Sequence, residues 1–156
     1  MAVQTKNVAG RRQLNFTCYQ DILDDVHALA ERPTRALGNW SLGKICRHLA
    51  IAMDMAIDGT DFKPNVLIRT VGRLLKKRYL TRPLSPGVRL PKRAAFLIPS
   101  EADTTEGIAE LERAIERMNR VAERKPHPFF GPLTRDEWDQ ITFRHSAMHL
   151  GFIVPE

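Results

Sequence analysis

Two histidines stand four residues apart near the end of the chain, in the segment RDEWDQITFRHSAMHLGF. In a helix, His145 and His149 would lie about 6 Å apart along the axis and on one face, so both imidazoles could reach the same point beside the helix. A divalent metal ion bound at about 2.1 Å from each nitrogen suits this arrangement, but a pair fills only half of a four-coordinate shell. The pair therefore predicts a metal site that needs a third donor.

His48 is the best candidate for the third donor. It falls inside the wide apolar arc of a helix expected over residues 41–58, where an unpaired imidazole would be costly to bury. Together with His145 and His149 it would give three nitrogens at the centre of a bundle. The alternative is that these are partly buried histidines satisfied by backbone groups or carboxylates, and the pair lacks the glutamate of the zinc-protease HExxH signature. The inward-facing His48 favours the metal site.

Other polar residues near these segments have simpler explanations. His127 precedes Pro128 in HPFFGP, where it either forms a turn, the preferred interpretation, or lines the mouth of a site. His27 lies in an acidic helical stretch and is expected at the surface. Lys44, one turn before His48, could attract an anionic substrate, although a surface lysine is the more common case. The sequence therefore identifies no catalytic or cofactor-binding residue beyond the three histidines.

The composition is that of an ordinary globular protein. The 156 residues are 43% hydrophobic and 27% charged, and we expect a single domain over residues 1–156 with one core. No apolar run reaches the roughly 18 residues of a membrane-crossing helix, and the first residues lack the apolar part of a secretion signal. Cys18 and Cys46 are widely spaced and predict reduced thiols. These features predict a cytoplasmic protein without a membrane partner.

The net charge of +6 is concentrated in one segment. Residues 62–100 contain ten Lys or Arg and no acid, while the rest contains fourteen basic and eighteen acidic residues, which gives +10 and −4. Anion or nucleic-acid binding through residues 69–93 is therefore one alternative function. No nucleic-acid-binding motif or interleaved aromatic residues accompany the charges, so a solvated helix face is preferred. We expect no nucleic-acid partner.

Apolar residues recur every three or four positions in four segments, the pattern of amphipathic helices, and no segment alternates convincingly with the period of a strand. Capping residues stand at the expected helix starts: Asn39 or Ser41, Asp103 with Glu106, and Thr134 with Glu137. The predicted fold class is all-α. The expected helices cover residues 17–32, 41–58, 104–124 and 134–152, with an accessory helix over 66–79.

The lengths of the connections predict how these helices are arranged. Short links join the first helix to the second and the third to the fourth, which favours antiparallel neighbours. About 43 residues separate the second helix from the third, enough to cross the bundle lengthwise and leave those two parallel. The proline-rich segment TRPLSPGVRLPKRAAFLIP in this connection is expected to be an irregular packing loop. The prediction is a four-helix bundle with a long, irregular or partly helical connection between helices two and three.

Three segments in order, NWSLGKICRHLAIAMD, HPFFGPLTRDEW and RHSAMH, resemble the DinB-like (YfiT-related) superfamily of metal-dependent hydrolases and thiol transferases. The likeness covers about residues 14–152 and is greatest to a branch described only as a domain of unknown function, DUF1569. The resemblance implies a four-helix bundle with up-down-down-up topology and a divalent metal held by His48, His145 and His149. It also implies a small-molecule substrate, a low-molecular-weight thiol as a possible cofactor and a possible homodimer.

These observations leave three functions open. Three neutral imidazoles would leave an ion at least one open position, as in catalytic sites, which favours a metal-dependent enzyme of the hydrolase or thiol-transferase kind. Imidazole ligands suit zinc, nickel and iron alike. A non-catalytic module that binds a metal or a small molecule would use the same pocket. A nucleic-acid binder would use the basic segment instead.

Overall fold

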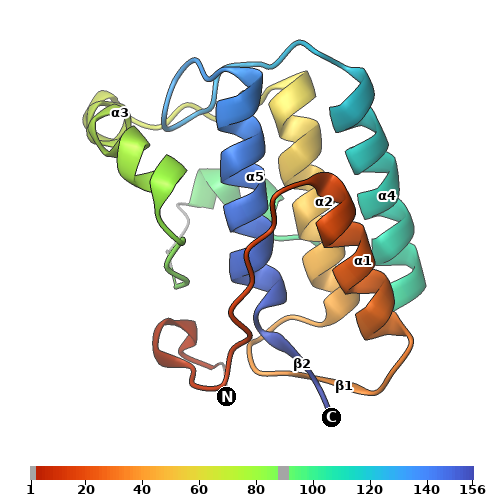
Figure 1. Cartoon of the computed structure of the whole chain (residues 1–156). Coiled ribbons are helices and arrows are strands. Elements are labelled where there is room, and N and C mark those ends of the chain that lie inside the picture. The colour runs from red at the N-terminus through yellow and green to blue at the C-terminus, as the bar shows by residue number, and fades with distance from the viewer. Residues whose placement is uncertain (1–2, 88–91) are drawn as a thin grey trace.

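The computed structural model describes residues 3–87 and 92–156, and this part of the chain is mostly helical (Figure 1). Its elements in chain order are η1 (Thr5–Asn7), α1 (Tyr19–Ala30), β1 (Thr34–Ala36), α2 (Leu42–Asp58), α3 (Val66–Thr81), η2 (Lys92–Leu97), α4 (Thr104–Arg120), α5 (Arg135–Leu150) and β2 (Ile153–Pro155). All predicted helices, including the accessory helix α3, are therefore present, although α4 ends at Arg120 and not at residue 124, because Val121 is already extended.

A small antiparallel sheet corrects the all-α prediction. β1 follows α1 and pairs with β2 at the end of the chain, with Arg35 opposite Val154. Each strand has three residues, too few for an alternating pattern to be recognised in the sequence. The pairing also explains why α5 ends at Leu150 and not at residue 152, because the chain turns there to enter β2.

Four helices, α1, α2, α4 and α5, lie side by side, and Figure 1 shows that α2 and α4 run in one direction and α1 and α5 in the other. Ion pairs agree with the parallel arrangement of α2 and α4: Arg47 near the start of α2 pairs with Glu106, and Asp58 at its end pairs with Arg117. The inner faces of these helices form the hydrophobic core. Its largest fully buried apolar side chains are Ile22, Ile45, Leu49, Met53, Leu111, Met118 and Leu150.

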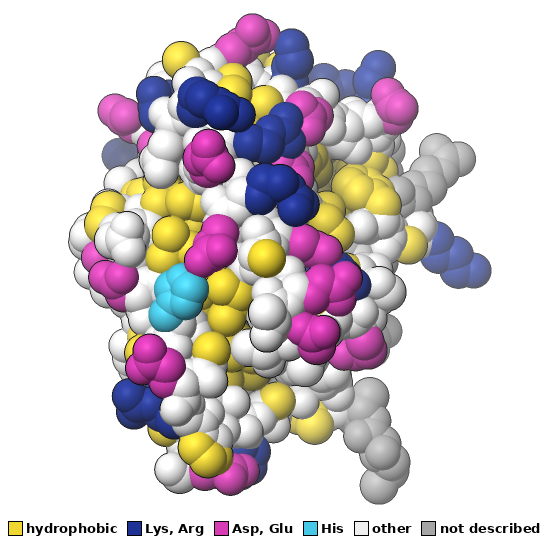
Figure 2. Space-filling view, turned by 90° about the vertical axis from the view of Figure 1, so that its right-hand side faces the viewer, with side chains coloured by type: hydrophobic (Ala, Val, Ile, Leu, Met, Phe, Trp, Pro, Cys, Tyr) yellow, Lys and Arg dark blue, Asp and Glu magenta, His cyan; other side chains and the backbone are white. Residues whose placement is uncertain are grey.

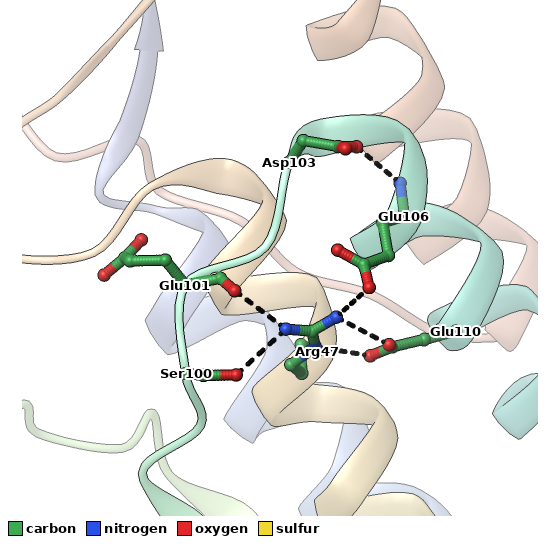
Figure 3. Close-up of polar contacts among 6 residues, drawn as sticks. All are labelled: Arg47, Ser100, Glu101, Asp103, Glu106 and Glu110. Atoms are coloured by element: carbon green, nitrogen blue, oxygen red, sulfur yellow. Dashed lines mark hydrogen bonds and ion pairs between the residues drawn. The ribbon is translucent and has the colours of Figure 1, made fainter.

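A charged network joins α2 to α4 at the end where both helices begin. Arg47 donates to both carboxylate oxygens of Glu110, at 2.9 and 2.8 Å, and pairs with Glu106 at 2.6 Å. Figure 3 shows that its guanidinium also reaches the loop before α4. Asp103 accepts the backbone N–H of Glu106 as predicted, but the Glu106 carboxylate is turned toward Arg47 and does not complete the expected capping box.

The long connection between α2 and α4 contains α3 and η2. α3 stands apart from the four packed helices in Figure 1, and none of its residues is buried. Its contacts with the rest of the chain include Tyr79 packed on Phe130 and Lys76 paired with Glu137 at 2.8 Å. η2 lies in the segment predicted to be an irregular loop and packs against α2. Residues 88–91 of that segment lie outside the described residues.

The side of the molecule away from α3 has a surface of mixed character. Figure 2 shows the right-hand side of Figure 1, where acidic, basic and hydrophobic side chains are interspersed. The basic helix α3 lies on the left in Figure 1.

Among the described helices, none combines the length and the apolar character that crossing a membrane requires. Both cysteines are free, as predicted; Cys46 is buried and Cys18 is exposed.

Candidate metal centre

The three predicted ligands converge on one point between α2 and α5. Nε2 of His145 lies 3.2 Å from Nε2 of His48 and 3.1 Å from Nε2 of His149. His48 projects from α2 and is buried, while His145 and His149 project from successive turns of α5 and are half-buried. One potential ligand atom from each residue lies within 4.8 Å of the others.

Neighbouring groups fix the direction of the rings. The carbonyl oxygen of Leu97, in η2, lies 2.5 Å from Nδ1 of His48. A carbonyl can only accept, so Nδ1 carries the proton, and the lone pair on the opposite nitrogen, Nε2, faces the other two histidines. Trp40, just before α2, stacks on His149 with ring centroids 5.4 Å apart and meets His48 edge-on at 5.0 Å.

Burial keeps the three imidazoles neutral. It lowers the pKa of His48, although the hydrogen bond to Leu97 acts in the opposite direction. The pKa of His145 falls to about 3, first through burial and then through the nearby His48 and His127. Burial also lowers the pKa of His149 well below 6.5, and neighbouring basic side chains add to this. Neutral imidazoles have the free lone pair that metal coordination requires.

The spacing of the cluster fits a metal ion. Two nitrogens at about 2.1 Å from a tetrahedral ion lie roughly 3.4 Å apart, close to the 3.2 and 3.1 Å separations of Nε2 atoms. Hydrogen bonds alone satisfy this arrangement poorly, because one proton on Nε2 of His145 cannot point well at both neighbours. A set of three imidazole nitrogens suits zinc, nickel or iron(II).

Most of the other polar candidates lie away from the cluster. Lys44 pairs with Glu101 at 2.7 Å, and His27 lies 2.9 Å from Glu112 at the surface. His27 lies at the surface, as preferred from the sequence, whereas the side chain of Lys44 is only 15% exposed and its Nζ lies 5.8 Å from the centroid of the Trp40 ring. His127 has both of the roles considered for it: its Nδ1 accepts backbone N–H groups of its own turn, and its side chain lines the same cavity as the three histidines.

The two acidic residues near the start of α5 have structural roles. Glu137 completes a capping box with Thr134, as predicted. Asp139 accepts a hydrogen bond of 2.5 Å from the hydroxyl of Tyr19. Neither residue belongs to the described lining of the cavity that contains the histidine cluster. No acidic general base is therefore found among these described lining residues.

Several contacts around the cluster were not predicted from the sequence. Trp40 is part of the segment NWSLGKICRH, and an aromatic residue placed just before a helix cap is a signal that it packs back on that helix. The Leu97 carbonyl has no sequence signal, because every residue has a carbonyl and only the fold brings this one to His48. Arg11, which donates to the carbonyl of Met148 at 2.8 Å, lies far away in sequence.

The fold and the site together define a mostly helical protein in which a buried cluster of three histidines could bind a metal ion. A family model described as a protein of unknown function, DUF1569, matches residues 8–156, and the chain belongs to this family. No curated protein and no solved structure matched the chain significantly.

Proposed function

We propose that the chain binds one divalent metal ion through Nε2 of His48, His145 and His149, and that it is a metal-dependent enzyme of the hydrolase or thiol-transferase kind. The convergence of the three nitrogens, with the lone pair of His48 oriented by Leu97, is the observation that carries the proposal. We also propose the DinB-like up-down-down-up bundle for the fold. The parallel α2 and α4, flanked by α1 and α5 in the opposite direction, support it.

The ion would supply Lewis acidity with at least one position open to a water or a low-molecular-weight thiol. The protein's own groups would orient the ligands and exclude water. Leu97 and Trp40 keep the rings of His48 and His149 in a fixed orientation, so less ordering is needed when the ligands are engaged. The apolar wall beside the cluster would exclude bulk water from a bound substrate.

Metal binding is tested with protein purified without a histidine tag and treated with a chelator. We expect calorimetry to show one equivalent of zinc or nickel bound by the wild type, with affinity lowered at least tenfold in His48→Ala, His145→Ala and His149→Ala. His27→Ala is the matched control, because this histidine is exposed on α1, and its affinity should stay unchanged. The metal should also raise the melting temperature of the wild type.

Two results would contradict the metal site. One is the failure of the folded wild type to bind either zinc or nickel. The other is binding that His145→Ala does not weaken, since this residue lies between the other two ligands.

Turnover of esters and thiol conjugates by the metal-loaded protein separates an enzyme from a non-catalytic binding module. Loss of turnover in His145→Ala would show that the activity depends on the cluster.

A nucleic-acid-binding function has weaker support. Lys76 of α3 is already paired with Glu137, and part of the basic stretch 69–93, residues 88–91, lies outside the described residues. We propose that duplex DNA is not a partner. A submicromolar complex at physiological salt, lost in Arg73→Glu with Lys76→Glu, would overturn this. We also propose a cytoplasmic location and a homodimer, and analytical sedimentation measures the oligomeric state.

A further inference from the structure

The histidine cluster forms one part of the wall of a larger cavity of about 700 Å³. Apart from the cluster, this wall is mostly aromatic and aliphatic. Its large aromatic and sulfur-containing members include Trp40, Phe129, Phe130, Trp138, Met148 and Phe152. A cavity of this size and composition is typical of a binding site for a small organic molecule.

The described residues that line the cavity have no charged side chain. None of the described residues that line it is Asp, Glu, Lys or Arg. Moving an ionised group into such surroundings without a partner charge costs several kcal/mol, whereas apolar groups gain free energy on leaving water. The part of a ligand that lies away from the three histidines is therefore expected to be neutral and mostly apolar.

One polar group in this wall has a fixed role. Nδ1 of His127 lies 3.1 Å from the backbone nitrogen of Phe129 and 3.3 Å from that of Phe130. Both backbone N–H groups are donors, so Nδ1 must accept. Burial lowers the pKa of His127 to about 3, so the ring is neutral at pH 7 and its one proton is on Nε2. The tautomer of this histidine is thus set by its own turn.

The surrounding turn also holds the ring in place. The ring of His127 stacks on Phe130 with centroids 4.4 Å apart and packs against Trp138 at 4.9 Å. Its backbone pairs with Gly131, whose φ of 74° is in the left-handed region that favours glycine. Among the described residues, none accepts a hydrogen bond from Nε2–H of His127. The cavity wall therefore contains an oriented donor that has no partner among the described residues.

We propose that the cavity binds an uncharged, mostly apolar carbonyl compound whose oxygen accepts a hydrogen bond from Nε2–H of His127. As an assignment of substrate class this rests on the proposed function, because it places the carbonyl in the cavity that also contains His145. The binding itself needs only the cavity and His127. Ester, thioester, amide and ketone groups are neutral and offer such an oxygen.

The test uses three probes of similar shape and chelator-treated protein, so that no metal can coordinate an oxygen. The probes are the ketone 2-acetonaphthone, the hydrocarbon 2-ethylnaphthalene and the carboxylate 2-naphthoate, and their affinities are measured by displacement of a fluorescent apolar dye. His127→Asn places an amide oxygen near the position of Nδ1 and keeps the turn, but it has no donor at Nε2. His127→Gln is the matched variant that places an amide N–H near Nε2.

We expect His127→Asn to weaken ketone binding about tenfold, the effect of one lost hydrogen bond, and to change hydrocarbon binding less than about twofold. His127→Gln should keep most of the ketone affinity. The carboxylate should bind the wild type more weakly than the ketone, because the described lining residues offer no partner charge. Nitrogen NMR of the His127 ring in the wild type should show the proton on Nε2, and this measurement does not depend on a variant that folds.

Three results would overturn the proposal: a proton on Nδ1, equal losses of ketone and hydrocarbon affinity in folded His127→Asn, or tighter binding of the carboxylate than of the ketone. The metal titration tests metal binding by the three ligand histidines, whereas these probes test ligand binding by His127 in metal-free protein. The failure of one proposal is thus distinguishable from the failure of the other.

Discussion

At the scale of single residues, backbone groups fix the tautomers of two histidines that line the cavity. The Leu97 carbonyl accepts from Nδ1 of His48, so only Nε2 of His48 is free to act as a ligand. In His127, Nδ1 accepts from backbone N–H groups of the turn that contains it, so only Nε2 is free to act as a donor. In the two proposals these imidazoles would therefore have different roles in one cavity: Nε2 of His48 would give its lone pair to a metal ion, and Nε2–H of His127 would donate a hydrogen bond to a bound molecule.

Ser146, next to His145 on α5, has a hydroxyl that no described neighbouring group orients. Its side chain is fully buried, and its hydroxyl has no hydrogen-bond partner among the described residues. A buried polar group without a partner costs about 1–3 kcal/mol. We therefore predict that Ser146→Ala raises the free energy of unfolding by about 1 kcal/mol, measured by urea denaturation. Ala also favours the helix slightly more than Ser does.

The control for this change is Ser41→Ala. The hydroxyl of Ser41 caps α2 by accepting the backbone N–H of Lys44, and its loss should lower the free energy of unfolding by about 1 kcal/mol. The two serine substitutions are thus expected to have opposite signs. A destabilising Ser146→Ala would mean that the hydroxyl makes a hydrogen bond in the folded protein.

At the scale of secondary-structure elements, the sequence predicted the helices and the three ligands for the same reason. His145 and His149 are four residues apart, so their position on one face of the last helix followed from helical periodicity. His48 was predicted from its place in the apolar arc of α2. The β1–β2 pairing and the contact between Leu97 and His48 depend on residues distant in sequence, and no local pattern indicates them.

The packing of α2 against α4 depends on two glycines. A Cβ atom added to Gly107 would collide with the backbone of Gly43, and one added to Gly43 would collide with the backbone of Asp103. Backbone cannot move aside as a flexible side chain can, so any larger residue must push the helices apart. α2 contains His48, so such a shift would also move one ligand of the cluster.

We therefore predict that Gly107→Ala lowers the free energy of unfolding by about 1–3 kcal/mol, as overpacking does, although alanine favours a helix by about 1 kcal/mol over glycine. Chemical denaturation measures the loss. Ala109→Gly, at an exposed position of α4, measures the intrinsic helix preference by itself and is the control. Equal or higher stability of Gly107→Ala would show that the helices can separate without cost.

At the scale of the whole molecule, the buried histidines link stability to pH. Burial lowers the pKa of His145 and of His127 to about 3, and it lowers the pKa values of His48 and His149 as well. In the unfolded chain a histidine titrates near 6.5. Below that pH the unfolded state binds more protons than the folded state, so the folded state loses stability as the pH falls from about 6.5.

We predict that the metal-free protein is most stable above pH 7 and loses up to about 1.4 kcal/mol per pH unit for each of these histidines below 6.5. Urea unfolding at pH 7.5, 6.5 and 5.5 in the presence of a chelator measures this slope before most carboxylates titrate. His145→Gln removes one titrating group and should make the slope shallower. A bound metal ion and protons compete for the same nitrogens. Because the pKa values of the folded ligands are low, these nitrogens are still unprotonated at pH 6, and the stabilisation by zinc at a fixed metal concentration should persist there. Stability that stays constant between pH 7.5 and 5.5 would contradict the burial of neutral imidazoles on which both the metal centre and the linkage depend.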